Sequence, residues 1–131
     1  MAEPTKVFVS YAQPDRSFAE ALVFELDRAG VDVWSDRELR FGQVWEEQVS
    51  AALAEAKVFV LVVSPDYLTS NWSMVEMGAA LARAREGATL VPVIAAPVAL
   101  PAALSEYLAL DAAVMSSAEI ANRIRTITRE S

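Results

Sequence analysis

One stretch of sequence constrains the fold more than any other: the unbroken apolar run VFVLVV at residues 58–63. A strand with one face in water alternates apolar and polar residues, whereas a run without alternation is typical of a strand covered on both faces. Strands of that kind occur in parallel sheets, because the crossovers between parallel strands place helices on both sides of the sheet. The run therefore predicts an α/β fold with a buried central strand.

The segments around this run alternate between strand and helix patterns. Further apolar runs begin near Lys6 (KVFVSY), Val31 (VDVW), Thr89 (TLVPVI) and, more weakly, Leu108 (LALD). Residues with the helical period lie between them, at Phe18, Leu22, Leu26 and Ala29, at Trp45, Val49, Leu53 and Ala56, from about Trp72 to Glu86, and at Ile120, Ile124 and Ile127. This alternation predicts a flavodoxin-like three-layer sandwich around a five-stranded parallel sheet. The preferred strand order is 2-1-3-4-5, which the sequence alone does not fix.

Local signals mark the ends of several predicted helices. Gly30 and Gly87 each follow a helical segment, as C-terminal caps do. The sequence SSAE at residues 116–119 matches a capping box. Ser64-Pro65 matches a cap followed by proline at the first helical position.

Small polar or acidic residues follow three of the predicted strands. They are Ser10 and Tyr11 after the first, Ser35 and Asp36 after the second, and Ser64 after the third. Ligands of open α/β sheets bind outside the carboxyl ends of the strands, so these residues are candidates for a binding site. Helix capping is the alternative role for Ser64 and for Ser10.

Charge and missing residue types exclude several classes of function. The chain has 18 acidic and 11 basic residues, and its net charge of −7 disfavours nucleic acid and anionic membrane surfaces as partners. It has no cysteine and no histidine. Disulfides, thiol nucleophiles, thiolate metal sites and Ser-His-Asp triads are therefore excluded, and no metal site is predicted.

Length and segment pattern predict one domain. The 131 residues fall near the common single-domain size, and a hydrophobic content of 54% is enough for one core. The start of the chain lacks a signal peptide, and the apolar stretch Leu90–Leu104 is broken by prolines and too short to span a bilayer, so the cytoplasm is the expected location. The expected unit is residues 1–131 with a core at 6–129, which could be one domain of a longer protein.

The glycines form no dinucleotide- or phosphate-binding motif. A receiver domain of a phosphorelay would share the strand order, but it needs acidic residues where this chain has Ser10-Tyr11 and Ser64. Cleavage of the N-glycosidic bond to a nicotinamide stays open, because the pyridinium leaves as a neutral base and needs no general acid. One well-placed carboxylate can stabilise the oxocarbenium-like ribose that remains.

The segment SNWSMVEMG at residues 70–78 offers such a carboxylate. The stripe expected to face the sheet consists of Met74, Met77, Gly78 and Leu81, and the stripe beside it of Trp72, Glu76, Ala79 and Arg83. Trp72 and Glu76 lie one helical turn apart and can share a pocket wall. The same residues also fit purely structural roles, because SMVE at 73–76 matches a capping box and Trp72 could be a core anchor.

In combination these motifs resemble a TIR domain, the Toll/interleukin-1 receptor/resistance-protein module, of the bacterial type. The strand KVFVSY followed by Asp15 resembles the first box of the family. Residues 30–45 resemble its second strand and the loop that follows, and SNWSMVE at 70–76 resembles its S-x-W-x-x-x-E signature. The resemblance covers nearly everything from Lys6 to about Arg129.

The resemblance implies an activity and a site. Many TIR domains cleave NAD⁺ to nicotinamide and ADP-ribose or a cyclic ADP-ribose, and the glutamate of the signature, here Glu76, is their catalytic residue. The remaining substrate-binding positions are Trp72 lining the nicotinamide pocket, Ser10 and Tyr11 at its floor, and Asp36 and Leu39 at its border. NAD⁺ would be the substrate, with no separate cofactor.

The resemblance also implies partners. The loop after the second strand mediates self-association in the family, several members are active only in filaments, and bacterial members serve antiphage defence. A sensor domain or partner would supply the trigger. The alternative is a non-catalytic TIR–TIR interaction module that uses the loop Asp36–Val44. Residues 12–14 favour this non-catalytic module, because their sequence is Ala-Gln-Pro at a place where NAD⁺-cleaving relatives often carry arginine. A third hypothesis is an N-ribosyl transferase of similar fold.

Overall fold

A five-stranded parallel sheet in the predicted order forms the centre of the protein. The structure, a computed structural model, describes residues 5–34 and 45–130. The strands follow the order β2-β1-β3-β4-β5, and each neighbouring pair is parallel. They are β1 (Lys6–Ser10), β2 (Asp32–Trp34), β3 (Val58–Val63), β4 (Thr89–Ile94) and β5 (Leu110–Asp111). The predicted order 2-1-3-4-5 and the flavodoxin-like α/β class are thus confirmed.

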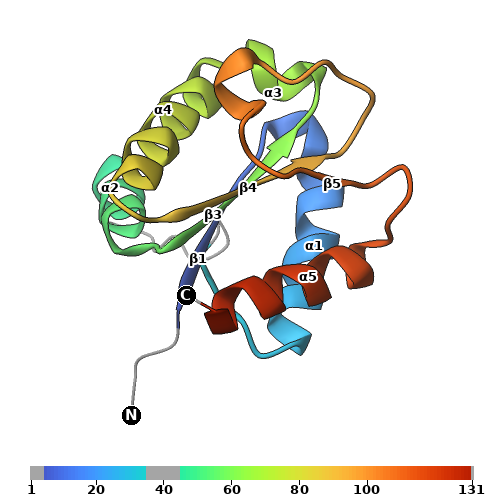
Figure 1. Cartoon of the computed structure of the whole chain (residues 1–131). Coiled ribbons are helices and arrows are strands. Elements are labelled where there is room, and N and C mark those ends of the chain that lie inside the picture. The colour runs from blue at the N-terminus through green and yellow to red at the C-terminus, as the bar shows by residue number, and fades with distance from the viewer. Residues whose placement is uncertain (1–4, 35–44, 131) are drawn as a thin grey trace.

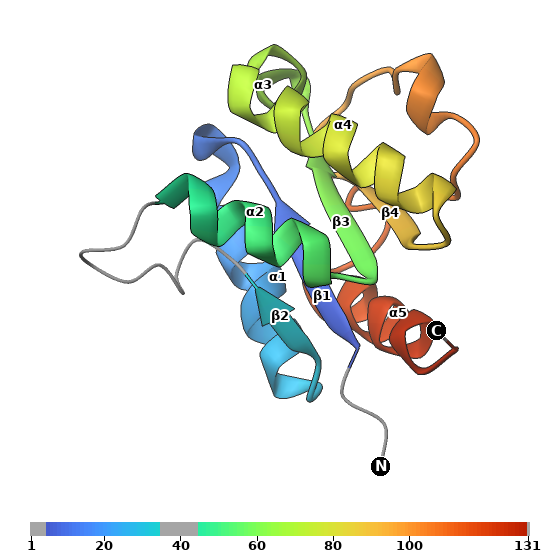
Figure 2. The same ribbon diagram turned by 90° about the vertical axis from the view of Figure 1, so that its left-hand side faces the viewer.

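Helices cover both faces of this sheet. They are α1 (Arg16–Arg28), α2 (Trp45–Glu55), the short α3 (Pro65–Thr69), α4 (Asn71–Arg85) and α5 (Ser117–Glu130), with 3₁₀ turns η1 (Gln13–Asp15) and η3 (Ala102–Leu104). Helices α1 and α5 lie on one face, and α2 and α4 lie on the other (Figure 1, Figure 2). Within the described ranges, no helix combines the length and apolarity needed to cross a membrane.

The side chains of β3 point alternately into two buried clusters, one on each face of the sheet. All six residues of β3 have an exposed fraction of 0%. The α1/α5 cluster contains Val58, Val60 and Val62 together with Leu22, Leu26, Ile120 and Ile124. The α2/α4 cluster contains Phe59, Leu61 and Val63 together with Phe8, Trp34, Val49 and Ala80. The prediction of a central strand covered on both faces is therefore confirmed.

The predicted helix ends form as expected. In the capping box of α5, the Ser116 N–H donates to Glu119 Oε1 and the Glu119 N–H donates to Ser116 Oγ, both at 3.1 Å. Gly30 has a φ of +81° after α1 and Gly87 a φ of +111° after α4, a backbone region that favours glycine. These ends fix where the chain leaves each helix to enter the next strand.

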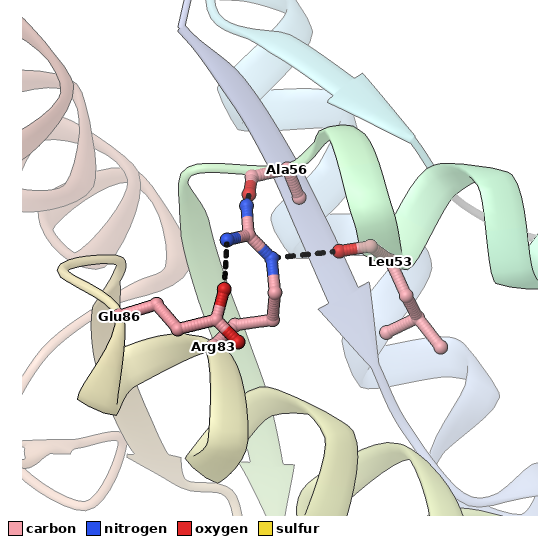
Figure 3. Close-up of polar contacts among 4 residues, drawn as sticks. All are labelled: Leu53, Ala56, Arg83 and Glu86. Atoms are coloured by element: carbon pink, nitrogen blue, oxygen red, sulfur yellow. Dashed lines mark hydrogen bonds and ion pairs between the residues drawn. The ribbon is translucent and has the colours of Figure 1, made fainter.

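Arg83 links α4 to the end of α2 by hydrogen bonds (Figure 3). Its Nη2 donates to the carbonyl of Ala56 at 2.6 Å, and its Nε donates to the carbonyl of Leu53 at 3.3 Å. Its Nη1 lies 3.6 Å from a carboxylate oxygen of Glu86, whose side chain is 67% exposed. The guanidinium therefore satisfies carbonyl groups at the C-terminal end of α2 and places a positive charge at the negative end of that helix.

Replacing Arg83 with methionine is expected to lower the free energy of unfolding by about 1–3 kcal/mol, because the carbonyls of Leu53 and Ala56 lose a charged donor. Urea denaturation of the variant and the wild type would measure the difference. The control Arg85→Met removes an exposed arginine of the same helical turn and should change stability by less than about 0.5 kcal/mol. Equal losses in the two variants would contradict a specific role for Arg83.

Candidate active site

Glu76 lies on the buried side of α4, in the second turn of the helix. The N-cap of α4 is Ser70, whose Oγ accepts a hydrogen bond from the N–H of Ser73 at 3.3 Å. The interpretation of Ser73–Glu76 as a capping box is therefore wrong, because the helix begins about one turn earlier than such a box requires. Glu76 is 4% exposed, and its Oε1 accepts a hydrogen bond from Ser10 Oγ at 2.7 Å.

The side of α4 that meets the core differs from the predicted stripe. The buried residues are Ser73, Glu76 and Ala80, whereas Met74, Met77 and Leu81 are partly buried and pack against the α2/α4 cluster. Gly78 is exposed, so its predicted place on a packed face is wrong. Apolar residues lie on several sides of this helix, and the pattern alone could not fix its rotation. Burial of a carboxylate is tolerated only with a hydrogen-bond partner, which Ser10 supplies from β1.

Three buried polar side chains form a continuous hydrogen-bonded chain at the carboxyl end of the sheet. Tyr67 Oη lies 2.8 Å from Ser10 Oγ, which in turn donates to Glu76 Oε1. The exposed fractions are 0% for Tyr67, 1% for Ser10 and 4% for Glu76. The three residues come from α3, β1 and α4, so only the tertiary fold brings them together. We refer to this arrangement as the Tyr67–Ser10–Glu76 chain.

Ser10 does not cap the turn that follows β1. The N-cap of η1 is Ala12, and no side chain accepts a hydrogen bond there. Its hydroxyl donates instead to Glu76, and its role at the floor of a substrate pocket stays a prediction. The capping alternative, which the sequence left open for this serine, is therefore wrong.

Tyr67 was not among the residues expected to contribute to a site. Burial raises the pKa of its phenol above the ordinary value of 10.0, the hydrogen bond with Ser10 acts in the opposite direction, and the charge of Glu76 raises it further. The phenol therefore stays protonated and remains a hydrogen-bond donor. Its position three residues after Ser64 is a usable signal, because an N-cap serine accepts the backbone N–H of that residue and so holds it near the strand end.

A raised pKa of Tyr67 in the folded protein makes stability depend on pH in the alkaline range. The neutral phenol contributes fully below about pH 10, and this contribution is lost as the pH rises from there toward the folded pKa, because only the unfolded chain then releases the proton. We expect the free energy of unfolding to fall above about pH 10 more steeply in the wild type than in Tyr67→Phe. Urea denaturation at a series of pH values would measure the slope. Tyr107→Phe leaves Tyr67 in place and should retain the wild-type slope.

A second contact joins the loops that follow β1 and β3. Ser64 Oγ accepts a hydrogen bond from the Tyr67 N–H at 3.0 Å, which confirms Ser64 as the N-cap of α3 with Pro65 at the first helical turn. The same hydroxyl donates to a carboxylate oxygen of Asp15, the residue at the start of α1. The pair holds α3, and with it Tyr67, against the end of β1.

The remaining candidate residues fall into three groups. Trp72 lies in the first turn of α4, is partly buried and packs against the α2/α4 cluster, on the face of the sheet where Glu76 is found. Tyr11 packs against the α1/α5 cluster on the opposite face. Asp36 and Leu39 lie outside the described residues. The roles of all four in substrate binding stay predictions.

A cavity lined by described residues lies at the other end of the sheet from these groups. Its volume is about 660 Å³, and its walls are Lys57, Arg83, Glu86, Gly87, Ala88, Thr89, Ile127 and Glu130. These residues surround the ends of the sheet where β3 and β4 begin, whereas Ser10 and Glu76 meet at the end where β1 finishes. The part of the chain that the structure describes contains no cluster of three acidic, histidine or cysteine side chains that could hold a metal ion.

A family model described as the TIR domain matches residues 7–126. The chain is also similar to two curated bacterial proteins. It is 30% identical to the 2' cyclic ADP-D-ribose synthase BtTIR of Bacteroides thetaiotaomicron, over 65% of this chain and 31% of that protein. It is 30% identical to the NAD(+) hydrolase TcpC of Escherichia coli O6:H1, over 59% of this chain and 26% of that protein. The match thus spans about a third or less of each relative's length.

Solved structures show the same likeness along most of the chain. The TIR domain of the Toll-related receptor TRR-2 from Hydra magnipapillata superposes with a TM-score of 0.78 and 25% identity, covering 92% of this chain and 96% of the other.

Proposed function

Because the chain belongs to the TIR domain family, we propose that it is an NAD⁺ glycohydrolase whose catalytic carboxylate is Glu76. The products would be nicotinamide and ADP-ribose or its cyclic form. This rests on the relatives named as NAD(+) hydrolase and 2' cyclic ADP-D-ribose synthase, and on the place of Glu76 in this fold.

The observation that carries the proposal is the burial of Glu76 beside the end of β1. A carboxylate with an exposed fraction of 4% and a hydrogen bond of 2.7 Å from Ser10 is held in a low-dielectric environment. Its negative charge interacts there more strongly with a nearby positive charge than it would in water. Such a group is suited to a reaction in which positive charge develops on a substrate.

The chemistry matches what the chain can supply. When the N-glycosidic bond of NAD⁺ breaks, both bonding electrons leave with the pyridinium nitrogen, and nicotinamide departs as a neutral base. The ribose gains oxocarbenium character, which the Glu76 carboxylate would stabilise until water, or the substrate's own adenosine part for a cyclic product, attacks the anomeric carbon. No histidine or cysteine is needed, and the chain has neither.

Nicotinamide release by concentrated protein tests the proposal. The protein would be incubated with NAD⁺ under dilute and crowded conditions, and nicotinamide, ADP-ribose and cyclic products would be separated by chromatography. Release that grows faster than protein concentration would support a further part of the proposal, that self-association completes the site. No release in any assembled state would overturn the proposed activity.

We further propose that the activity serves antiphage defence in the cytoplasm and is triggered through a sensor domain or partner. The loop Asp36–Val44, which lies outside the described residues, is the proposed assembly element. Survival of a phage-infected host, with and without the gene, would test the role in defence. NAD⁺ levels that stay constant after infection in a protected host would contradict it.

The alternative function is a TIR–TIR interaction module without catalysis. The observation that favours it is the segment Ala12-Gln13-Pro14, where Ala12 is buried and Gln13 and Pro14 form part of η1, so this turn presents no arginine to a phosphate. Under this alternative, self-association would persist in Glu76→Gln and no nicotinamide would be released by any variant.

A further inference from the structure

The Tyr67–Ser10–Glu76 chain contains a residue whose side chain the proposed reaction does not itself use. We propose that Tyr67 is a positioning residue, which acts through Ser10 to hold the Glu76 carboxylate in the orientation that cleavage requires. The inference rests on the proposed function of Glu76 and extends it to a residue in another element. Its basis is the pair of contacts at 2.8 Å and 2.7 Å that link the three side chains.

The direction of the hydrogen bonds follows from the number of protons available. The reaction needs Glu76 ionised, and an ionised carboxylate only accepts hydrogen bonds. Ser10 has one hydroxyl proton, which it donates to Glu76 Oε1. The contact between Ser10 Oγ and Tyr67 Oη must then be a donation from the phenol. In the Tyr67–Ser10–Glu76 chain, Tyr67 therefore donates to Ser10, and Ser10 donates to the carboxylate of Glu76.

Each hydrogen bond of the Tyr67–Ser10–Glu76 chain restricts the rotation of a side-chain torsion. The last torsion of a glutamate is broad and roughly two-fold, so packing alone does not set the plane of the carboxylate. A charge-assisted hydrogen bond from Ser10 selects one orientation. The serine hydroxyl could itself point in several directions, and donation from Tyr67 to its oxygen leaves its proton directed at Glu76.

Tyr67 is well placed to act as the fixed end of the Tyr67–Ser10–Glu76 chain. Its side chain has an exposed fraction of 0% and belongs to the α2/α4 cluster, so its ring cannot move freely. Its backbone N–H is held by Ser64 Oγ at 3.0 Å, and Ser64 also donates to Asp15. The phenol oxygen is therefore positioned by two loops and one core cluster rather than by Glu76.

The test compares Tyr67→Phe with Tyr107→Phe in the nicotinamide-release assay. Both substitutions remove one phenol oxygen, and both rings pack in the α2/α4 cluster, but only Tyr67 contacts Ser10. We expect kcat of Tyr67→Phe to fall by about 10- to 100-fold, the range typical of small displacements of a reacting group, with KM changed by less than about twofold. Tyr107→Phe should match the wild type.

A double-mutant cycle separates positioning from a purely structural role. If Tyr67 acts through Ser10, adding Tyr67→Phe to Ser10→Ala should change kcat by less than about twofold, because the link is already broken. If the two losses multiply instead, Tyr67 acts by another route and the inference is overturned. An unchanged kcat in Tyr67→Phe alone overturns it as well.

Failure of this inference can be told from failure of the proposed function. A wild type that releases nicotinamide, together with a fully active Tyr67→Phe, overturns only the positioning role of Tyr67. A wild type that releases none under any condition overturns both. A second measurement needs no turnover: the ¹³C resonance of the Glu76 carboxyl, assigned with Glu76→Gln, should shift in Tyr67→Phe and stay in place in Tyr107→Phe. An unchanged chemical shift of this resonance in Tyr67→Phe would overturn the positioning role of Tyr67, even if that variant were too unstable for kinetics.

Discussion

Replacing Glu76 with glutamine is expected to lower the rate of nicotinamide release by at least about 10²- to 10³-fold, the loss typical of removing a preorganised electrostatic group from an active site. The amide is nearly the same size as the carboxylate, and its oxygen can still accept the hydrogen bond from Ser10, which lies 2.7 Å from the native Oε1. The substitution removes the negative charge and replaces one carboxylate oxygen by an NH2 group. The rate loss would therefore report the charge on Glu76 rather than the packing around it.

Stability should move in the opposite direction to activity in this variant. A carboxylate with 4% exposure carries a desolvation cost that a neutral amide does not, so the melting temperature of Glu76→Gln should equal or exceed that of the wild type. The matched control is Glu86→Gln, which changes an exposed glutamate at the end of the same helix and should alter neither rate nor melting temperature. A fully active Glu76→Gln protein would contradict the proposed role.

Replacing Phe8 with alanine is expected to cause the largest loss of stability, about 3–5 kcal/mol. The ring has an exposed fraction of 0% and stacks on Trp34 with 5.0 Å between centroids and 7° between planes. A second ring, Phe59, lies 6.1 Å away. Removal would leave a cavity that the rigid sheet cannot close, and the lost contacts add to the lost transfer free energy.

Urea or guanidinium denaturation would measure this loss, with a surface phenylalanine as the control. Phe24 of α1 is 56% exposed, and the guanidinium of Arg28 lies 5.8 Å from its ring centroid. Phe24→Ala should cost less than about 1 kcal/mol, because it opens no cavity and loses only an exposed cation–π contact. A similar loss in both variants would contradict the assignment of Phe8 to the core.

The parts of the fold that the sequence predicted are those with a local physical cause. The run Val58–Val63 has no polar position and therefore needs cover on both faces, and the structure provides it. The capping box at Ser116–Glu119 satisfies its own backbone donors within one turn, so it formed as predicted. Glycines after α1 and α4 close those helices for the same local reason.

Two of the predictions that were wrong concern the rotation and the start of α4. The sequence Ser73–Glu76 matches the S-x-x-E pattern of a capping box at every position. The N-cap of α4 is nevertheless Ser70. The stripe assigned to the core placed Gly78 inward, whereas the structure exposes it and buries Glu76. Neither outcome could be read from α4 alone, because the deciding partner of Glu76 lies in β1.

The sequence by itself determined the α/β class, the central strand, most helix ends and the absence of histidine and cysteine chemistry, since these follow from periodicity, local hydrogen bonding and composition. The tertiary structure alone decided that the side chains of Tyr67, Ser10 and Glu76 meet. They are separated by up to 66 positions in the chain, and only a parallel sheet that aligns the ends of its strands brings them within hydrogen-bonding distance. A buried carboxylate is tolerated where such partners exist, and their presence is a property of the assembled core rather than of any segment.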